Sequence, residues 1–115
     1  MRKDDSVRLL HMLEAAREVL SFAENKTRAS LNTDRKLALA LVKDIETIGE
    51  AAANVTSERR EELPEIPWDK IVGMRNRLIH AYFDIDLDVL WKTITEDIPL
   101  LISRLEKIVS PGGQP

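Results

Sequence analysis

Apolar residues recur at steps of three and four along most of this chain, which is the spacing of a helix with one buried face. The pattern predicts a first helix over residues 5–25 and a second over residues 34–56. A third helix is predicted from Pro67 to residue 82 or 83, and a fourth over residues 87–108. Four amphipathic helices with modest loops favour an all-α fold, an antiparallel and mostly up-and-down four-helix bundle.

Each predicted helix carries one apolar stripe that we expect to face the core. In the first two helices the stripes are Leu9, Leu10, Leu13, Ala16, Leu20 and Ala23, then Leu37, Leu41, Ile45, Ile48, Ala52 and Val55. In the last two they are Trp68, Ile71, Val72, Met74, Leu78 and Ile79, then Leu87, Leu90, Trp91, Ile94, Ile98, Leu101, Ile102, Leu105 and Ile108. Pro99 interrupts the last stripe without changing its phase, so we expect a kink with the proline on the solvent side.

The segments between the helices are polar. Residues 26–33 are expected to form a polar connection, residues 57–67 a charged loop, and residues 84–86 a short turn. Residues 49–53 of the second helix are a small-residue patch that lets a neighbouring backbone come close. We expect residues 1–109 to form a single domain and residues 110–115 a flexible tail.

The composition is that of a globular protein and not of a disordered one. Of 115 residues, 43% are hydrophobic and 32% charged, and none is cysteine, which excludes disulfides and thiolate chemistry. No signal peptide or membrane-spanning run is apparent, so we expect a cytoplasmic protein. The formal net charge is −3, so binding of a polyanion would depend on a local basic patch.

One octapeptide, residues 75–82, concentrates the reactive side chains. It contains two arginines, one of the two histidines and the only tyrosine. On a helical wheel Arg75 falls inside the apolar arc, whereas Asn76 and His80 lie one turn apart at its edge and Arg77 points outward. Burying an arginine is costly unless it is paired or faces a polar cleft.

Two explanations of Arg75 remain open from the sequence. Arg75 is paired inside the bundle, with Glu46 or Glu50 as its partner, or it lines a cleft at a contact between two subunits. The two glutamates lie one turn apart, so they are either a solvated face or a pair of which one orients a basic residue of the octapeptide.

The octapeptide suits one chemistry in particular, the cleavage of RNA by its own 2′-hydroxyl without a metal or cofactor. His80 can move protons near neutral pH, and Arg75 can stabilise the developing phosphorane charge. Asn76 can orient the ring or the phosphate. Because one chain supplies a single suitable histidine, a two-fold dimer would help. His11 lies on the polar side of the first helix and is expected to be solvated.

The motif resembles that of a known family. Arg75, four intervening residues, His80, one residue and Tyr82 are similar to the Arg-x4-His-x-Tyr signature of the HEPN superfamily. More narrowly, the chain resembles HepT-type toxins over nearly its whole length. The similarity includes residues 48–52, the pair Pro67-Trp68, residues 74–83, Asp86 and Trp91.

The resemblance implies a HEPN-like helical bundle that forms a homodimer around the motif helix and cleaves RNA. It implies that Arg75 and His80 are catalytic and that Asn76 and Arg77 support them. It also implies a partner, an antitoxin with a minimal nucleotidyltransferase (MNT) domain, which transfers AMP from ATP to Tyr82. Without the motif, Tyr82 is interpreted as an ordinary packing residue with a wet hydroxyl.

Two other readings of the chain stay open. In one, the same dimer is a binding module, a nucleotide- or substrate-binding partner of a nucleotidyltransferase that hydrolyses nothing. In the other, the dimer is purely structural and Arg75 belongs to a buried ion pair.

Overall fold

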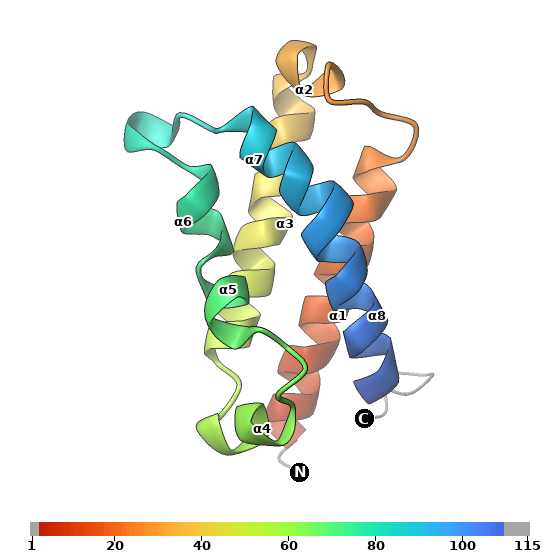
Figure 1. Ribbon diagram of the computed structural model, residues 1–115, viewed down its shortest axis with the longest axis vertical. Coiled ribbons are helices and arrows are strands. Elements are labelled where there is room, and N and C mark those ends of the chain that lie inside the picture. The colour runs from red at the N-terminus through yellow and green to blue at the C-terminus, as the bar shows by residue number, and fades with distance from the viewer. Residues whose placement is uncertain (1–2, 110–115) are drawn as a thin grey trace.

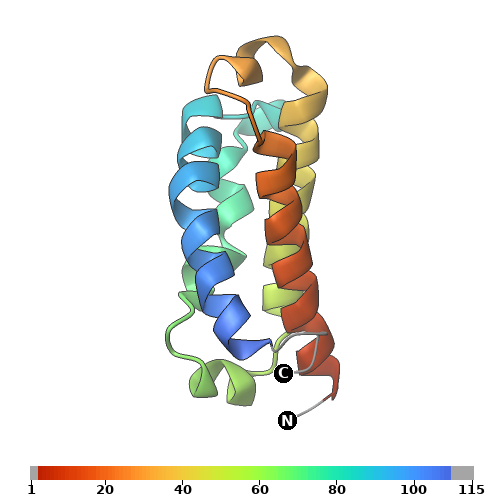
Figure 2. The same ribbon diagram turned by 90° about the vertical axis from the view of Figure 1, so that its right-hand side faces the viewer.

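Four columns of helix lie side by side in the computed structural model, which describes residues 3–109 (Figures 1 and 2). In chain order, the columns are α1 (Lys3–Ala23), α3 (Arg35–Ala53), α5 (Trp68–Val72) with α6 (Met74–Leu78), and α7 (Leu87–Lys92) with η2 (Thr93–Asp97) and α8 (Ile98–Ile108). Successive columns run in opposite directions. The predicted all-α, up-and-down bundle is therefore confirmed.

The core follows the predicted stripes closely. All six stripe residues of the second predicted helix are buried, the last of them, Val55, just beyond the end of α3, and those of α1 are buried or packed against the core. The buried face of α1 is wider than predicted, because α1 packs against both α3 and α8 and also buries Met12, Ala15 and Val19. A helix with two neighbours buries a broader arc than a single stripe.

Two connections are more ordered than the sequence indicated. The polar connection ends in one helical turn, α2 (Ser30–Thr33), and the charged loop begins with a short helix, α4 (Ser57–Glu62). The prediction of a loop throughout residues 57–67 was therefore wrong. A run of charged residues shows no apolar stripe, so periodicity cannot detect such a helix.

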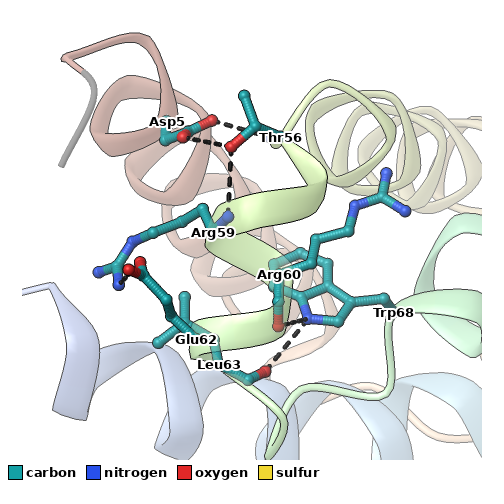
Figure 3. A network of polar contacts seen from close by, with 7 residues as sticks. All are labelled: Asp5, Thr56, Arg59, Arg60, Glu62, Leu63 and Trp68. Carbon is teal, nitrogen blue, oxygen red and sulfur yellow. Dashed lines mark hydrogen bonds and ion pairs between the residues drawn. The ribbon is translucent and has the colours of Figure 1, made fainter.

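Side chains from three elements hold α4 in place (Figure 3). The hydroxyl and backbone N–H of Thr56 donate to the carboxylate of Asp5, at 2.8 and 2.9 Å, and the Thr56 hydroxyl accepts the N–H of Arg59 at 3.3 Å. Thr56 is thus the N-cap of α4. The guanidinium of Arg60 donates to carbonyls at the end of α3. The indole N–H of Trp68 donates to the Arg60 carbonyl (Figure 3). These contacts fix where α5 begins.

The third predicted helix differs most from the structure. It is divided at Gly73 into α5 and α6, and it ends at Leu78 instead of residue 82 or 83. Ile79 is extended and forms an isolated antiparallel bridge with Ile85. The carbonyl of Leu78 accepts the N–H of Asp86 at 2.7 Å, so it cannot continue the helix.

The last column is continuous past Pro99, as expected. The proline is exposed, which confirms its predicted position on the solvent side. The π-helical turn η2 ends two residues before it, at Asp97. A proline removes one backbone donor and crowds the carbonyl four residues earlier, and a π turn shifts the hydrogen bonds around that defect.

The structure adds two limited findings on the rest of the chain. Between residues 3 and 109, none of the helices is long and apolar enough to cross a membrane. The predicted tail, residues 110–115, lies outside the described residues.

Candidate active site

Arg75 lies on α6 and is paired with α3. Its Nε atom lies 2.7 Å from Oε2 of Glu46, and both side chains are about one third exposed, at 35% and 28%. The hydrogen bond from Arg75 is the main reason that the pKa of Glu46 is lowered, and Lys43 adds a second, longer contact. Of the two partners that the sequence suggested, the structure selects Glu46.

The same arginine also faces an open groove between α3 and α6. The groove has a volume of about 450 Å³, and it is lined by Glu46, Gly49, Glu50, Ala53, Val72, Arg75 and Asn76. Only the Nε atom of Arg75 has a hydrogen-bond partner among the residues that the structure describes, which leaves the Nη donors for a ligand. Arg75 is therefore paired, as the first explanation requires, and it also lines a groove, so the first explanation does not exclude the second.

Gly49 permits this close arrangement of helices. A Cβ atom built at Gly49 would lie 3.4 Å from the carbonyl oxygen of Val72 and 3.5 Å from that of Ile71. The backbone of α5 therefore rests directly on α3, as predicted for the small-residue patch. Gly49 and Val72, which make this contact, also line the groove beside Arg75.

His80 and Tyr82 lie beyond the helix, on a tight loop. Two short backbone bonds close the loop, from His80 N–H to the Asp84 carbonyl and from Asp86 N–H to the Leu78 carbonyl, each 2.7 Å. His80 itself is extended. The prediction that Asn76 and His80 lie one turn apart on a helix was therefore wrong. Asn76 stays with Arg75 in the groove, and His80 is not one of the residues that line it.

His80 meets a carboxylate on the far side of this loop. Its Nε2 atom lies 3.4 Å from Oδ2 of Asp86, and the histidine side chain is 58% exposed. The other carboxylate oxygen of Asp86 accepts the N–H of Val89 and caps α7. That N–H bond is the largest cause of the lowered pKa of Asp86, and His80 contributes to it. The sequence alone indicated no chemical role for Asp86, although a capping aspartate shortly after a histidine was a usable signal.

Tyr82 occupies the tip of the loop. It is fully exposed, at 100%, and its backbone is left-handed with φ 60° and ψ 33°. This conformation is unfavourable for a residue with a Cβ atom. The full exposure of its side chain does not agree with an ordinary packing role.

Arg77 has a structural contact instead of a place in the groove. It is exposed, and its Nη2 atom donates to the carbonyl oxygen of Lys70 at 3.1 Å. Lys70 lies in the last turn of α5, where carbonyls lack helical partners. The outward direction predicted for Arg77 is confirmed.

A second polar hollow lies between α1 and α3. It has a volume of about 240 Å³ and is lined by His11, Glu14, Ala15, Glu18, Asp44 and Thr47. Asp44 is only 8% exposed, and burial next to Glu18 raises its pKa to about 7. His11 is exposed, as expected. Within residues 3–109 no cluster of three or more His, Asp or Glu residues is arranged to hold a metal ion.

An all-α bundle that carries an Arg-x4-His-x-Tyr segment on α6 and the following loop matches known proteins. A family model described as Ribonuclease HepT-like matches residues 12–108, and the chain belongs to this family. The "Probable ribonuclease HepT" of Thermococcus cleftensis is 41% identical over 100 residues, which cover 84% of this chain and 91% of that protein.

Two proteins of Methanocaldococcus jannaschii are also similar. One is named as a candidate RNase and is 34% identical over 91% of this chain and 96% of its own length. The other is named as a gamma-glutamylcyclotransferase and candidate RNase. It is 38% identical over 95% of this chain but only 49% of its own length. A search of the solved structures finds no significant match.

Proposed function

We propose that this chain is a metal-independent endoribonuclease, the toxin of a toxin–antitoxin pair, acting in the cytoplasm. Membership of a ribonuclease family supports the activity. The observation that supports this site is the position of the Arg75 guanidinium. One of its nitrogens is bonded to Glu46, and the others face the groove. Such a group can bind a phosphate with two parallel hydrogen bonds.

In the proposed reaction, His80 takes the proton of an RNA 2′-hydroxyl, and the resulting oxygen attacks the adjacent phosphorus. The bond from phosphorus to the 5′-oxygen breaks, and that oxygen leaves with a proton from a protonated histidine. The products are a 2′,3′-cyclic phosphate and a 5′-hydroxyl. Arg75 stabilises the charge that develops on the phosphorane, and Asn76 helps to hold the phosphate.

A homodimer would complete this site. His80 is not among the residues that line the groove of Arg75 and Asn76, so the groove of a single chain lacks the catalytic histidine. Val72, which is 38% exposed, and Ala53 give the groove an apolar component that suits a protein contact. Two chains related by a two-fold axis would bring two copies of Arg75 and of His80 to one cleft, one histidine as base and the other as acid.

We further propose that a partner nucleotidyltransferase, the antitoxin, switches the enzyme off at Tyr82. The tyrosine oxygen attacks the α-phosphorus of ATP and pyrophosphate leaves, so that AMP remains in a phosphodiester. The complete exposure of Tyr82 at a loop tip supports access by a second enzyme. The new anion would compete with RNA phosphate for the cationic site and block it.

The test is cleavage of RNA by the purified protein in EDTA. We expect fragments with 2′,3′-cyclic phosphate ends, and the loss of these fragments in His80→Ala and in Arg75→Ala while both variants remain dimeric. Full activity of both variants would contradict the catalytic assignment. Growth inhibition on expression should be lost in the same two variants.

The same experiment decides between this proposal and a binding module. RNA or nucleotide binding without cleavage would identify a non-hydrolytic partner of a nucleotidyltransferase. The groove that Arg75 lines is the observation that supports this second candidate, because such a groove can bind a phosphate without cleaving it. A folded Arg75→Met variant with unchanged stability and normal partner function would instead indicate a structural ion pair.

A further inference from the structure

Asp86 is held in position by bonds on both its backbone and its side chain. Its backbone N–H donates to the carbonyl of Leu78 at 2.7 Å, and its Oδ1 accepts the N–H of Val89 at 3.1 Å. The remaining oxygen, Oδ2, is the one that lies 3.4 Å from Nε2 of His80. The carboxylate therefore cannot rotate without losing the cap of α7.

We propose that Asp86 is a positioning residue that holds neutral His80 in the Nε2–H tautomer and leaves Nδ1 as the nitrogen that exchanges protons with substrate. The chemical reason is that an ionised carboxylate only accepts hydrogen bonds, so the ring nitrogen that faces it must carry a proton. The role of Nδ1 toward RNA rests on the proposed ribonuclease function. The tautomer itself does not.

The contact differs from an ordinary surface ion pair. Exposed pairs are weak because two flexible side chains must be ordered to form them. Here the Asp86 carboxylate is already ordered by the cap, and the backbone bridge between Ile79 and Ile85 places the two sides of the loop against each other. Because the Val89 N–H lowers its pKa, Asp86 stays ionised wherever a histidine titrates.

The substitution Asp86→Asn gives a sharp test, because asparagine is as good an N-cap as aspartate. Its Oδ1 can still accept the N–H of Val89, so α7 is kept. Its Nδ2 then replaces the oxygen that faces His80 and offers a hydrogen-bond donor. A donor at this place requires an unprotonated Nε2, so the variant should favour the Nδ1–H tautomer. The same exchange of a carboxylate for an amide beside a catalytic histidine fixes the wrong tautomer in serine proteases.

The measurement is the pair of imidazole ¹⁵N chemical shifts in the full chain, at a pH where the rings are neutral. The chain has two histidines, and His11, which is exposed and is not in contact with Asp86, provides the reference shifts. The matched control is Asp84→Asn, which removes the same charge from the same loop but whose carboxylate is exposed. We expect His80 to be nearly pure Nε2–H in the wild type and in Asp84→Asn, and shifted to Nδ1–H in Asp86→Asn.

Two outcomes would overturn the proposal. One is a His80 tautomer mixture equal to that of His11 in the wild type. The other is an unchanged tautomer in folded Asp86→Asn. Neither outcome depends on ribonuclease activity. A wild-type protein that cleaves no RNA would therefore contradict the proposed function but would not affect the conclusion about the His80 tautomer. If the wild type cleaves RNA, Asp86→Asn should lower the rate about 10²-fold, and cleavage at the wild-type rate would also overturn the proposal.

Discussion

The Nε atom of Arg75 lies 2.7 Å from Oε2 of Glu46, so the arginine of the motif is anchored to α3 before any ligand arrives. The bond orients the guanidinium without using its Nη donors. An arginine that is already oriented loses less freedom when it binds a phosphate. The Arg75–Glu46 pair therefore links α6 to α3 and also orients the guanidinium in the groove.

Removal of this anchor should impair cleavage more than folding. We expect Glu46→Ala to lower kcat about tenfold, because Arg75 loses its orientation. Glu46→Gln should have a smaller effect, since the amide oxygen still accepts the Nε–H. Initial rates on a fluorogenic RNA and a thermal melt of each variant would measure the two effects. The contrast is Glu50→Ala, which removes a carboxylate from the same groove but breaks no bond to Arg75. A fall in kcat as large in Glu50→Ala as in Glu46→Ala would contradict the anchor.

Tyr82→Phe should abolish modification without an effect on the fold. The side chain is completely exposed, so we expect the free energy of unfolding to change by less than about 0.5 kcal/mol. Intact mass after coexpression with the nucleotidyltransferase should show an AMP-sized increment in the wild type and none in Tyr82→Phe. The variant should also remain toxic in the presence of the partner. Neutralisation of Tyr82→Phe without a mass increment would rule out the switch.

Asp44 should make stability depend on pH. Its pKa is raised from 3.8 to about 7, so the folded chain keeps a proton that the unfolded chain releases in this range. Stability from this group is therefore fully present below pH 3.8 and is lost as pH rises through about 7. The slope is at most about 1.4 kcal/mol per pH unit.

Asp44→Asn should remove this dependence, because an amide mimics the protonated acid and can donate to Glu18. Denaturant unfolding at pH 5 and pH 8 would show a variant that is more stable than the wild type at pH 8. The control is Glu14→Gln, an exposed residue of the same hollow, which should keep the wild-type slope. Equal pH slopes in the wild type and Asp44→Asn would show that Asp44 is ionised in the folded state.

Gly49 should tolerate one carbon but not a large side chain. In Gly49→Ala the new Cβ makes ordinary contacts with the backbone of α5, and alanine favours a helix by about 1 kcal/mol over glycine, so stability should rise. Gly49→Leu should push α5 off α3 and destabilise the chain by about 1–3 kcal/mol. Chemical unfolding would measure both. Ala53→Leu, at an exposed position of the same groove, is the control and should stay near wild type.

The order of apolar and polar residues was enough to predict the bundle. Helical periodicity depends only on the order of apolar and polar residues, so it placed the four columns, the buried stripe of α3 and the exposed side of Pro99. The motif residues were also found from the sequence, together with the need of Arg75 for a partner. An arginine inside an apolar arc can be recognised on a helical wheel without any knowledge of how the helices pack.

The arrangement of the motif depends on contacts between distant parts of the chain, which the sequence does not show. The segment from Leu78 to Asp86 could continue a helix or pair across a loop, because the apolar residues Leu78 and Ile79 fit both patterns. Bonds between its two ends select the loop, and these bonds join groups that no local pattern relates. As a result His80 faces Asp86 instead of Asn76, and the side chain of Tyr82 is fully exposed at the tip of the loop. The choice of Glu46 over Glu50 also depends on tertiary packing, because it is decided by where Arg75 of α6 lies along α3.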